Sequence, residues 1–343
     1  MPAFKQQRIP EYARTVAHHS RALRERWESH VANHGTYTSD IDNEMAMHVL
    51  NIAALTLFGQ PLDADAQKIS ATVHALSELA FHESTSAFTL PDWLPLPSKR
   101  KKRAVIRTMH DAIHRITGER LLGKRDDRGD LLSMLIEHHE GNRVAIEEDS
   151  MSLLIAGHET SGATLTWLFI LLAQHPEALR QVQKELDTVT EGAEVDFGML
   201  AKLPYLLAAT QEAMRLYPAA YALFCRRAQT DVDLGNGINI RRGDLVQLMP
   251  YITQRDARWF KEPQTFKPER FLSEPDWPRY AYIPFGAGPR VCIGQSFGLM
   301  EVMLTAATLL QTLEPQTVSQ SPLPSPRFSL RPEAGFELIW QRR

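Results

Sequence analysis

Residues 285–294 read Phe-Gly-Ala-Gly-Pro-Arg-Val-Cys-Ile-Gly, and no other stretch of the 343-residue chain is as informative about its fold. Cys292 stands here among three glycines and a proline, just ahead of an apolar segment. Glycines let a backbone turn tightly and approach a flat ligand closely. A helix that follows would point its N-terminal amides at the sulfur and favour the thiolate. Such a thiolate can be the axial ligand of a haem iron. A buried structural cysteine is the alternative.

The same loop fits a longer pattern, Phe-x-x-Gly-x-Arg-x-Cys-x-Gly, which begins at Phe285. This pattern resembles the haem-thiolate loop of the cytochrome P450 family at every defining position. The resemblance implies that the chain binds haem b with Cys292 as the ligand of the iron, and that Arg290 pairs with a haem propionate. The implied cofactor-binding positions of the loop are Phe285, Gly286, Arg290, Cys292 and Gly294.

Composition narrows the class of protein. Of the residues, 43% are hydrophobic and 23% charged, as in an ordinary globular domain with a sizeable core. A formal net charge of −3 gives no sign of a nucleic-acid partner. Two cysteines are too few for a disulfide framework and are consistent with a cytoplasmic protein. The second cysteine, Cys225, lacks the glycine context of Cys292 and is interpreted as a small buried residue.

The most apolar stretch covers residues 151–173 and carries His158 and Glu159 at its centre. A bilayer would penalise both side chains. A helix that is apolar on nearly every side is better explained as a buried central helix. We therefore expect a long internal helix and no membrane span.

Periodicity along the chain predicts a mainly α fold with a minor β portion. Helical spacing of apolar residues runs through most of residues 1–215. From 219 to 284, short alternating runs separated by Pro and Gly predict small strand pairs. The tail from 328 to 340 alternates in the manner of a terminal hairpin.

The predicted central helix contains Ala156-Gly157-His158-Glu159-Thr160-Ser161. This run resembles the oxygen-binding groove of the P450 distal helix, Ala-Gly-x-(Asp/Glu)-Thr. The resemblance implies that Ala156 and Gly157 leave room for the cofactor, that Thr160 hydrogen-bonds dioxygen, and that Glu159 relays protons. The alternative is a helix crossing that needs small residues, with Glu159 paired elsewhere.

Glu212 and Arg215 stand at spacing i, i+3, where helical side chains meet. Taken alone, such a pair is usually a weak surface ion pair. The spacing also resembles the buried Glu-x-x-Arg pair of the P450 family, which a further arginine joins. Here that arginine would be Arg270, in the Pro-Glu-Arg-Phe segment at 268–271. The resemblance implies structural roles for all three residues.

A second arginine for the haem propionates is expected in Phe-Cys-Arg-Arg-Ala, at residues 224–228. The resemblance favours Arg227, with Arg226 as the competing choice. For either residue, a solvated surface arginine is an equally good explanation.

The resemblance starts part of the way through the family's fold. The first nine residues are similar to the end of the family's third major helix. We therefore expect residues 1–343 to form a single P450-like domain that lacks the N-terminal quarter of an ordinary member. The N-terminal sheet, the lid over the substrate and most of the third helix would be missing. In other respects the chain resembles soluble bacterial members.

The resemblance implies a haem-thiolate monooxygenase that inserts one oxygen atom from dioxygen into a lipophilic small organic substrate. Electrons would come from a ferredoxin- or flavodoxin-type partner or from a reductase. The alternative is a truncated, non-catalytic fragment with weak or no haem binding, since the front of the fold is expected to be missing. A peroxide-driven enzyme ranks below the first hypothesis, because the family's peroxide users commonly lack the acid–alcohol pair that Glu159 and Thr160 represent.

Overall fold

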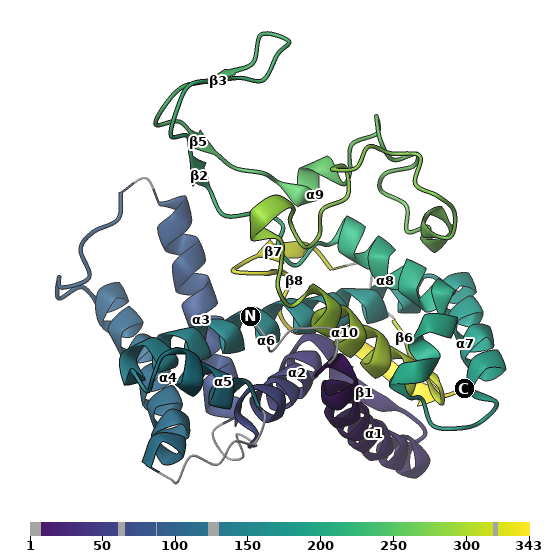
Figure 1. Cartoon of the computed structure of the whole chain (residues 1–343). Helices are drawn as coiled ribbons and strands as arrows, with labels where there is room; N and C mark the ends of the chain where they lie inside the picture. The colour runs from purple at the N-terminus through teal and green to yellow at the C-terminus, as the bar shows by residue number, and fades with distance from the viewer. Residues whose placement is uncertain (1–7, 61–65, 87, 123–129, 318–321) are drawn as a thin grey trace.

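Helices predominate in the computed structural model of the chain (Figure 1). The structure describes residues 8–60, 66–86, 88–122, 130–317 and 322–343. Four helices form its centre: α1 (Ile9–His34), α2 (Ile41–Phe58), α6 (Arg143–Gln174) and α10 (Gln295–Leu310). Helix α1 packs against α2 and α10, and α6 packs against the same two helices. The four helices therefore form a bundle around one hydrophobic core, as a mainly α fold requires.

The ends of these helices follow from local sequence. Asp40 caps α2, because its carboxylate accepts a hydrogen bond from the backbone N–H of Asn43 at 3.1 Å. The helix ends at Gly59, whose φ of +65° suits glycine. Asn142 caps α6 in the same way as Asp40 caps α2, through the backbone N–H of Ala145 at 3.4 Å.

Helix α6 crosses the middle of the protein, and His158 and Glu159 at its centre are fully buried. The expected long internal helix is therefore confirmed. None of the described helices combines the length and the apolar composition that a membrane crossing requires.

A smaller core lies on one side of the bundle. Helices α3 (Ala66–Thr85), α4 (Pro97–Leu122) and α5 (Leu131–His138) form it together with α2 and α6. On the other side, α7 (Pro176–Thr190) and α8 (Pro204–Leu216) pack against α6 and α10. Between α7 and α8 lies a short 3-10 helix, η4 (Phe197–Lys202).

The largest sheet is antiparallel, with the strand order β1-β9-β6. It joins β1 (Tyr37–Asp40), β9 (Glu337–Arg342) and β6 (Leu313–Gln316), with Tyr37 opposite Trp340. Strand β8 (Leu330–Pro332) pairs with β7 (Pro324–Pro326) instead. The expected terminal hairpin is therefore wrong: both tail strands form, but they belong to different sheets. Alternation predicts a strand and carries no information about its partner.

The β portion before the cysteine loop is small, as predicted. Strands β2 (Arg226–Arg227) and β5 (Leu245–Val246) pair with each other, and β3 (Val232–Asp233) pairs with β4 (Asn239–Ile240). Figure 1 shows this arm extending away from the helices. The chain then passes through three short helices before α10: α9 (Pro250–Thr253), η5 (Pro268–Phe271) and η6 (Gly288–Arg290).

Candidate active site

The cysteine loop turns back on itself immediately before α10. The backbone N–H of Cys292 donates to the carbonyl of Phe285 at 2.9 Å and closes the loop. Gly286 and Gly288 both have a φ of +72°, a conformation that suits glycine and strains other residues. A Cβ on Gly294 would stand 3.8 Å from the Cys292 sulfur. These glycines therefore let the loop present an exposed thiol at the start of a helix.

The thiol lines a cavity of about 640 Å³, a size typical of sites for small molecules and cofactors. One wall is helix α6, through Ala156, Gly157 and Thr160. The cysteine loop forms another wall, and α2 contributes further apolar residues. The structure thus brings the two most distinctive sequence motifs to one cavity.

The α6 wall of the cavity has open space at Gly157. A Cβ built there would meet no described atom within 4 Å. Gly157→Ala is expected to raise the free energy of unfolding by about 0.5–1 kcal/mol, since alanine loses less backbone entropy in a helix. Urea denaturation of the two proteins measures the difference. A lower free energy of unfolding in the alanine variant would contradict the open space at this position.

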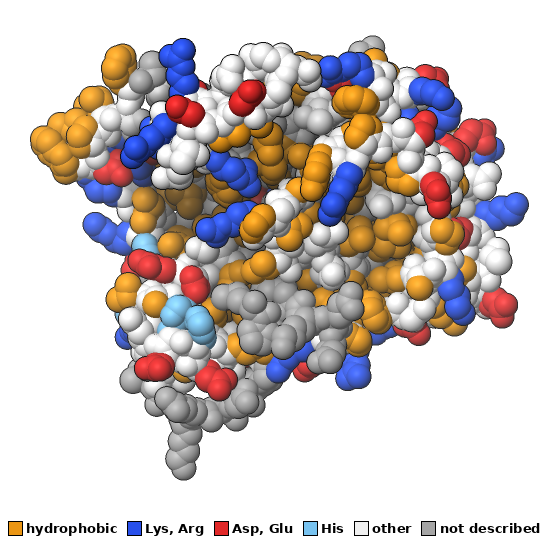
Figure 2. All heavy atoms as spheres, turned by 45° about the horizontal axis from the view of Figure 1, so that its top comes forward, with side chains coloured by type: hydrophobic (Ala, Val, Ile, Leu, Met, Phe, Trp, Pro, Cys, Tyr) orange, Lys and Arg blue, Asp and Glu red, His pale blue; other side chains and the backbone are white. Residues whose placement is uncertain are grey.

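The remaining lining fits a flat apolar ligand with acidic edges. Ile293 and Phe224 line the cavity with large exposed apolar surface, which is unusual unless a ligand covers it. Arg226 and Arg290 line the same cavity and could pair with carboxylates. On the face that Figure 2 brings forward, hydrophobic side chains lie in a hollow with Lys and Arg side chains at its edge. Haem, a planar macrocycle with two propionates, fits this donor set.

The two adjacent arginines lie differently. Arg226 lines the cavity, whereas the described cavity wall does not include Arg227, whose guanidinium donates to the Gly243 carbonyl at 3.1 Å. Alternate residues of a strand point to opposite sides, so one of the pair had to face away. The prediction that Cys225 is buried is wrong, because its thiol is exposed and lines the cavity.

Thr160 faces the cavity with its hydroxyl turned to the helix backbone. The hydroxyl donates to the Ala156 carbonyl at 2.8 Å, and its lone pairs are left to accept hydrogen bonds. Thr164, one turn further along, lines the same wall and donates to the Thr160 carbonyl at 2.9 Å. Together with Ser161, which also lines the cavity, these residues make this part of the α6 wall polar.

Glu159 points elsewhere. It is fully buried and is not among the described residues that line the cavity. Its carboxylate accepts from the Ser329 hydroxyl at 2.8 Å and from the Arg331 guanidinium at 3.2 Å. His74 lies 3.9 Å from its other oxygen. Burial would raise the pKa of Glu159, but Arg331 and the other partners outweigh burial and hold that pKa below its ordinary value.

Glu212, Arg215 and Arg270 form one buried cluster. The Arg215 guanidinium donates to both carboxylate oxygens of Glu212, at 2.7 and 2.9 Å. Arg270 and the backbone N–H of Lys267 donate to one of those oxygens, each at 2.9 Å. The cluster thus ties α8 to the segment around η5, which leads to the cysteine loop.

Gln254 is a positioning residue that the sequence reasoning did not identify. Its fully buried amide donates to the carbonyls of Met214 and Arg215, at 3.0 and 3.1 Å. Its oxygen accepts from the backbone N–H of Ile283 at 2.9 Å, two residues before the cysteine loop. Polar residues at the end of a short helix give no sequence signal for such a role.

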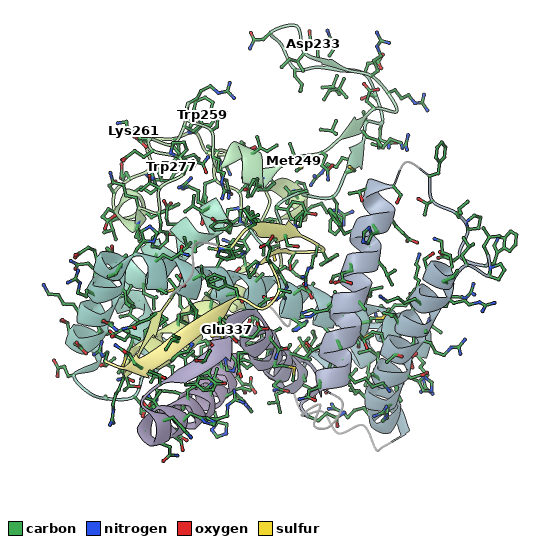
Figure 3. The ribbon with its side chains drawn as sticks, turned by 180° about the vertical axis from the view of Figure 1, so that it is seen from behind. Asp233, Met249, Trp259, Lys261, Trp277 and Glu337 are labelled. Carbon is green, nitrogen blue, oxygen red and sulfur yellow. The ribbon has the colours of Figure 1, made fainter. Side chains whose placement is uncertain are left out.

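Aromatic contacts hold the segment between α9 and the cysteine loop. Trp277 packs against Phe260 and Phe271, with ring centroids 4.9 and 5.3 Å apart. Figure 3 labels Trp277 close to Trp259 and Lys261 on this segment. The irregular chain ahead of Cys292 is therefore fixed by packing as well as by hydrogen bonds.

Glu301, on α10, is a second residue that the sequence reasoning missed. It lines the cavity, and its residue surface is only 1% exposed. Among the described residues, neither carboxyl oxygen has a hydrogen-bond partner of normal geometry. Burial raises the pKa of Glu301 to about 8, and the Ser161 hydroxyl offsets part of that rise. The sequence signal that could have identified Glu301 was an acidic residue in an otherwise apolar helix.

The raised pKa of Glu301 predicts a pH-dependent stability. The folded protein keeps the proton up to about pH 8, whereas the unfolded chain releases it near the ordinary value of 4.5. Stability from this group is complete below pH 4.5 and declines by about 1.4 kcal/mol per pH unit as the pH rises towards 8. Glu301→Gln removes this decline. The free energy of unfolding of the variant, relative to that of the unchanged protein, should therefore increase between pH 5 and 8. Thermal unfolding across this range measures it; a constant difference would contradict the burial of a neutral acid.

Comparisons with known proteins agree with this geometry. A family model described as cytochrome P450 matches residues 1–340. Cyclooctatin synthase of Streptomyces melanosporofaciens is 29% identical over 341 residues, which cover 97% of this chain and 72% of that protein. Carotene epsilon-monooxygenase of Arabidopsis thaliana, a chloroplastic protein, is 31% identical over 307 residues, or 81% of this chain and 56% of that protein.

A further relative, cytochrome P450 132 of Mycobacterium tuberculosis, is 34% identical over 252 residues, which cover 72% of this chain and 54% of that protein. This chain thus spans about half the length of several of the curated relatives it matches. The family match extends over nearly the whole chain and includes the cysteine loop, the α6 motif and the Glu212 cluster. This chain belongs to the cytochrome P450 family.

Proposed function

We propose that this protein is a haem-thiolate monooxygenase that inserts one atom of dioxygen into a lipophilic small organic substrate. The observation that carries the proposal is the exposed thiol of Cys292, which shares one cavity with Thr160. Thiolate-ligated haem supplies the chemistry when bound, since the thiolate donates electron density that favours O–O cleavage. Electrons would come from a ferredoxin- or flavodoxin-type protein or from a reductase.

Residues of the cysteine loop and of strand β2 would hold the cofactor. Cys292 would bind the iron, with Phe285, Gly286 and Gly294 shaping the loop around the sulfur. Arg290 would pair with a propionate. For the second propionate, the position of Arg226 in the cavity wall supports it over Arg227.

The apolar part of the cavity supports a lipophilic substrate. Ala53 and Leu57 from α2 and Leu153 from α6 line it, and they offer contacts that favour hydrocarbon over charged groups. Thr160 would accept and donate hydrogen bonds beside the reacting atoms and so help to deliver protons.

Isotopically labelled dioxygen tests the proposal. The haem-loaded chain is supplied with a ferredoxin, its reductase, NADPH and a lipophilic compound that changes the haem spectrum on binding. We expect one labelled atom in the product and the other in water. Product that carries oxygen from water would contradict the proposal. Equal turnover with peroxide alone would favour the peroxide-driven alternative, and failure to retain haem would favour a non-catalytic fragment.

Thr160→Val is expected to divert electrons to hydrogen peroxide, because the variant keeps the shape of the side chain and loses the hydroxyl. Removing one hydrogen bond to reacting atoms typically costs about 10²-fold or more in productive rate. The ratio of peroxide to product measures the effect. Thr164→Val is the matched control, since Thr164 lines the same wall one turn away. Equal ratios in the two variants would contradict a special role for Thr160.

A further inference from the structure

The loop between α3 and α4, residues 88–96, exposes an unusual amount of apolar surface. Among the described residues it carries two of the three most exposed large hydrophobic side chains: Phe88 is 89% exposed and Trp93 75%. Leu90 and Leu96 are exposed as well. Figure 1 shows this segment bowing outward from the two helices. Single apolar residues on a surface are ordinary, but four within one short loop indicate a contact with an apolar partner. We call this segment the apolar loop.

A ring of four charged side chains fixes the apolar loop. The Lys99 ammonium donates to Glu83 at the end of α3, at 2.6 Å, and to Asp92 in the loop, at 2.9 Å. Lys102 donates to the same two carboxylates, at 2.7 and 2.8 Å. Arg103 donates to the backbone carbonyl of Asp92. Because the loop is tied to both helices, its aromatic side chains are held outward, and less conformational entropy is lost when a partner covers them.

Basic side chains follow the apolar loop at the start of α4. Residues 83–107 include six lysines and arginines but only two acidic residues. The ring of charges neutralises two of each. Arg100, Lys101 and Arg107 are exposed and have no ion-pair partner within the part of the chain that the structure describes. An apolar projection and an uncompensated positive charge therefore lie side by side.

This combination matches the surface of an anionic lipid bilayer. Exposed apolar side chains can enter the boundary between headgroups and acyl chains, while neighbouring Lys and Arg side chains attract anionic headgroups. Trp93 suits such a boundary, because indole has an apolar ring and one N–H donor. A protein partner would need a fitted pocket for each projecting side chain, whereas a bilayer adapts to a convex loop.

We propose that the apolar loop and the basic start of α4 bind the surface of an anionic lipid bilayer. The four apolar side chains of the loop enter the bilayer boundary, and Arg100 and Lys101 contact lipid phosphates. Salt weakens the binding, because these charges are exposed. The inference goes beyond the proposed function and does not depend on it. If both hold, the contact brings the enzyme to a place where lipophilic compounds dissolve.

Flotation of the full chain with lipid vesicles tests the proposal. We expect binding to vesicles of equal parts phosphatidylcholine and phosphatidylglycerol. The double variant Phe88→Ser/Trp93→Ser should weaken it by about tenfold or more, since two apolar side chains no longer leave water. Leu323→Ser is the matched control, because Leu323 is 66% exposed but lies outside the apolar loop. Absence of binding by the unchanged chain, or equal losses in the two variants, would overturn the proposal.

The contribution of charge is tested with the same vesicles. Arg100→Gln and Lys101→Gln should each weaken binding by about fivefold, the usual effect of one basic side chain near an anionic surface. Lys202→Gln provides the control, since Lys202 is exposed on η4 and distant from the apolar loop in sequence. Equal affinities of all three variants, or equal binding of the unchanged chain to pure phosphatidylcholine, would overturn the preference for anionic lipid.

Amide hydrogen exchange locates the contact. Vesicles should slow exchange in residues 88–96 of the unchanged chain. Slower exchange elsewhere, with these residues unaffected, would overturn the assignment of the loop. Sedimentation without lipid examines a second copy of the chain as the occupant. A dimer that the double variant disrupts, in a chain that does not bind vesicles, would replace the bilayer with that second copy.

Discussion

Cys292→Ser is expected to abolish oxygenation and to weaken haem binding by more than a hundredfold. Even the loss of a residue that supports a metal ligand costs about 10- to 100-fold in affinity, and here the ligand itself is removed. A serine hydroxyl does not ionise as a thiol does and cannot supply the electron density that a thiolate provides. Transfer of haem to an apoglobin measures the affinity, and product formation with an electron donor measures the activity.

The second cysteine provides a matched control for this experiment. Cys225 lines the same cavity and is exposed, but it lies outside the glycine loop. Cys225→Ser should therefore retain both haem and activity. If it instead lost them while Cys292→Ser retained them, the assignment of the iron ligand would be wrong.

Glu212→Ala is expected to destabilise the fold by about 3–5 kcal/mol, the usual effect of breaking a buried ion pair. Arg215 is fully buried and Arg270 nearly so, and the substitution leaves both guanidinium groups without the carboxylate they share. Urea denaturation measures the loss. Haem binding should weaken as well, because the cluster holds the segment that leads to Cys292.

Glu177→Ala is the matched control for Glu212. Glu177 pairs with Arg180 at the same i, i+3 spacing on α7, but both side chains are exposed. Exposed pairs contribute about 0–1 kcal/mol, so this variant should unfold at nearly the same urea concentration as the unchanged protein. Equal losses in the two variants would contradict the importance of burial at Glu212.

The mainly α fold and the position of Cys292 could be predicted because their signals are local. Glycine spacing defines the loop, and apolar periodicity defines the helices. The partners of the tail strands could not be predicted, since strand pairing depends on how distant elements meet. Sequence alone could not decide between Arg226 and Arg227 for a related reason: the side of a two-residue strand that faces a cavity is set by its tertiary environment.

Glu159 and Thr160 are adjacent in sequence, but only Thr160 lines the cavity. Adjacent helical residues can share one wall, as Ala156 and Gly157 do, so the motif alone does not show which of its members faces the cavity. Only the structure shows that Glu159 pairs with Arg331, which lies 172 positions further along the chain.

Glu301 illustrates the opposite case, in which a residue without a motif occupies the site. It lies nine positions after Cys292 in an apolar helix, where an acid is unfavourable unless it has a purpose. Sequence alone does not reveal whether such an acid pairs with a distant base or faces a cavity. The structure answers the question: Glu301 lines the cavity, and its carboxyl oxygens have no hydrogen-bond partner among the described residues.

The carbon monoxide difference spectrum of the reduced, haem-loaded chain tests most directly whether Cys292 holds the iron as a thiolate. We predict a Soret band at the position of thiolate-ligated haem, present in Cys225→Ser and absent in Cys292→Ser. A band at the position of nitrogen-ligated haem in the unchanged protein, or the same thiolate band in Cys292→Ser, would contradict the assignment.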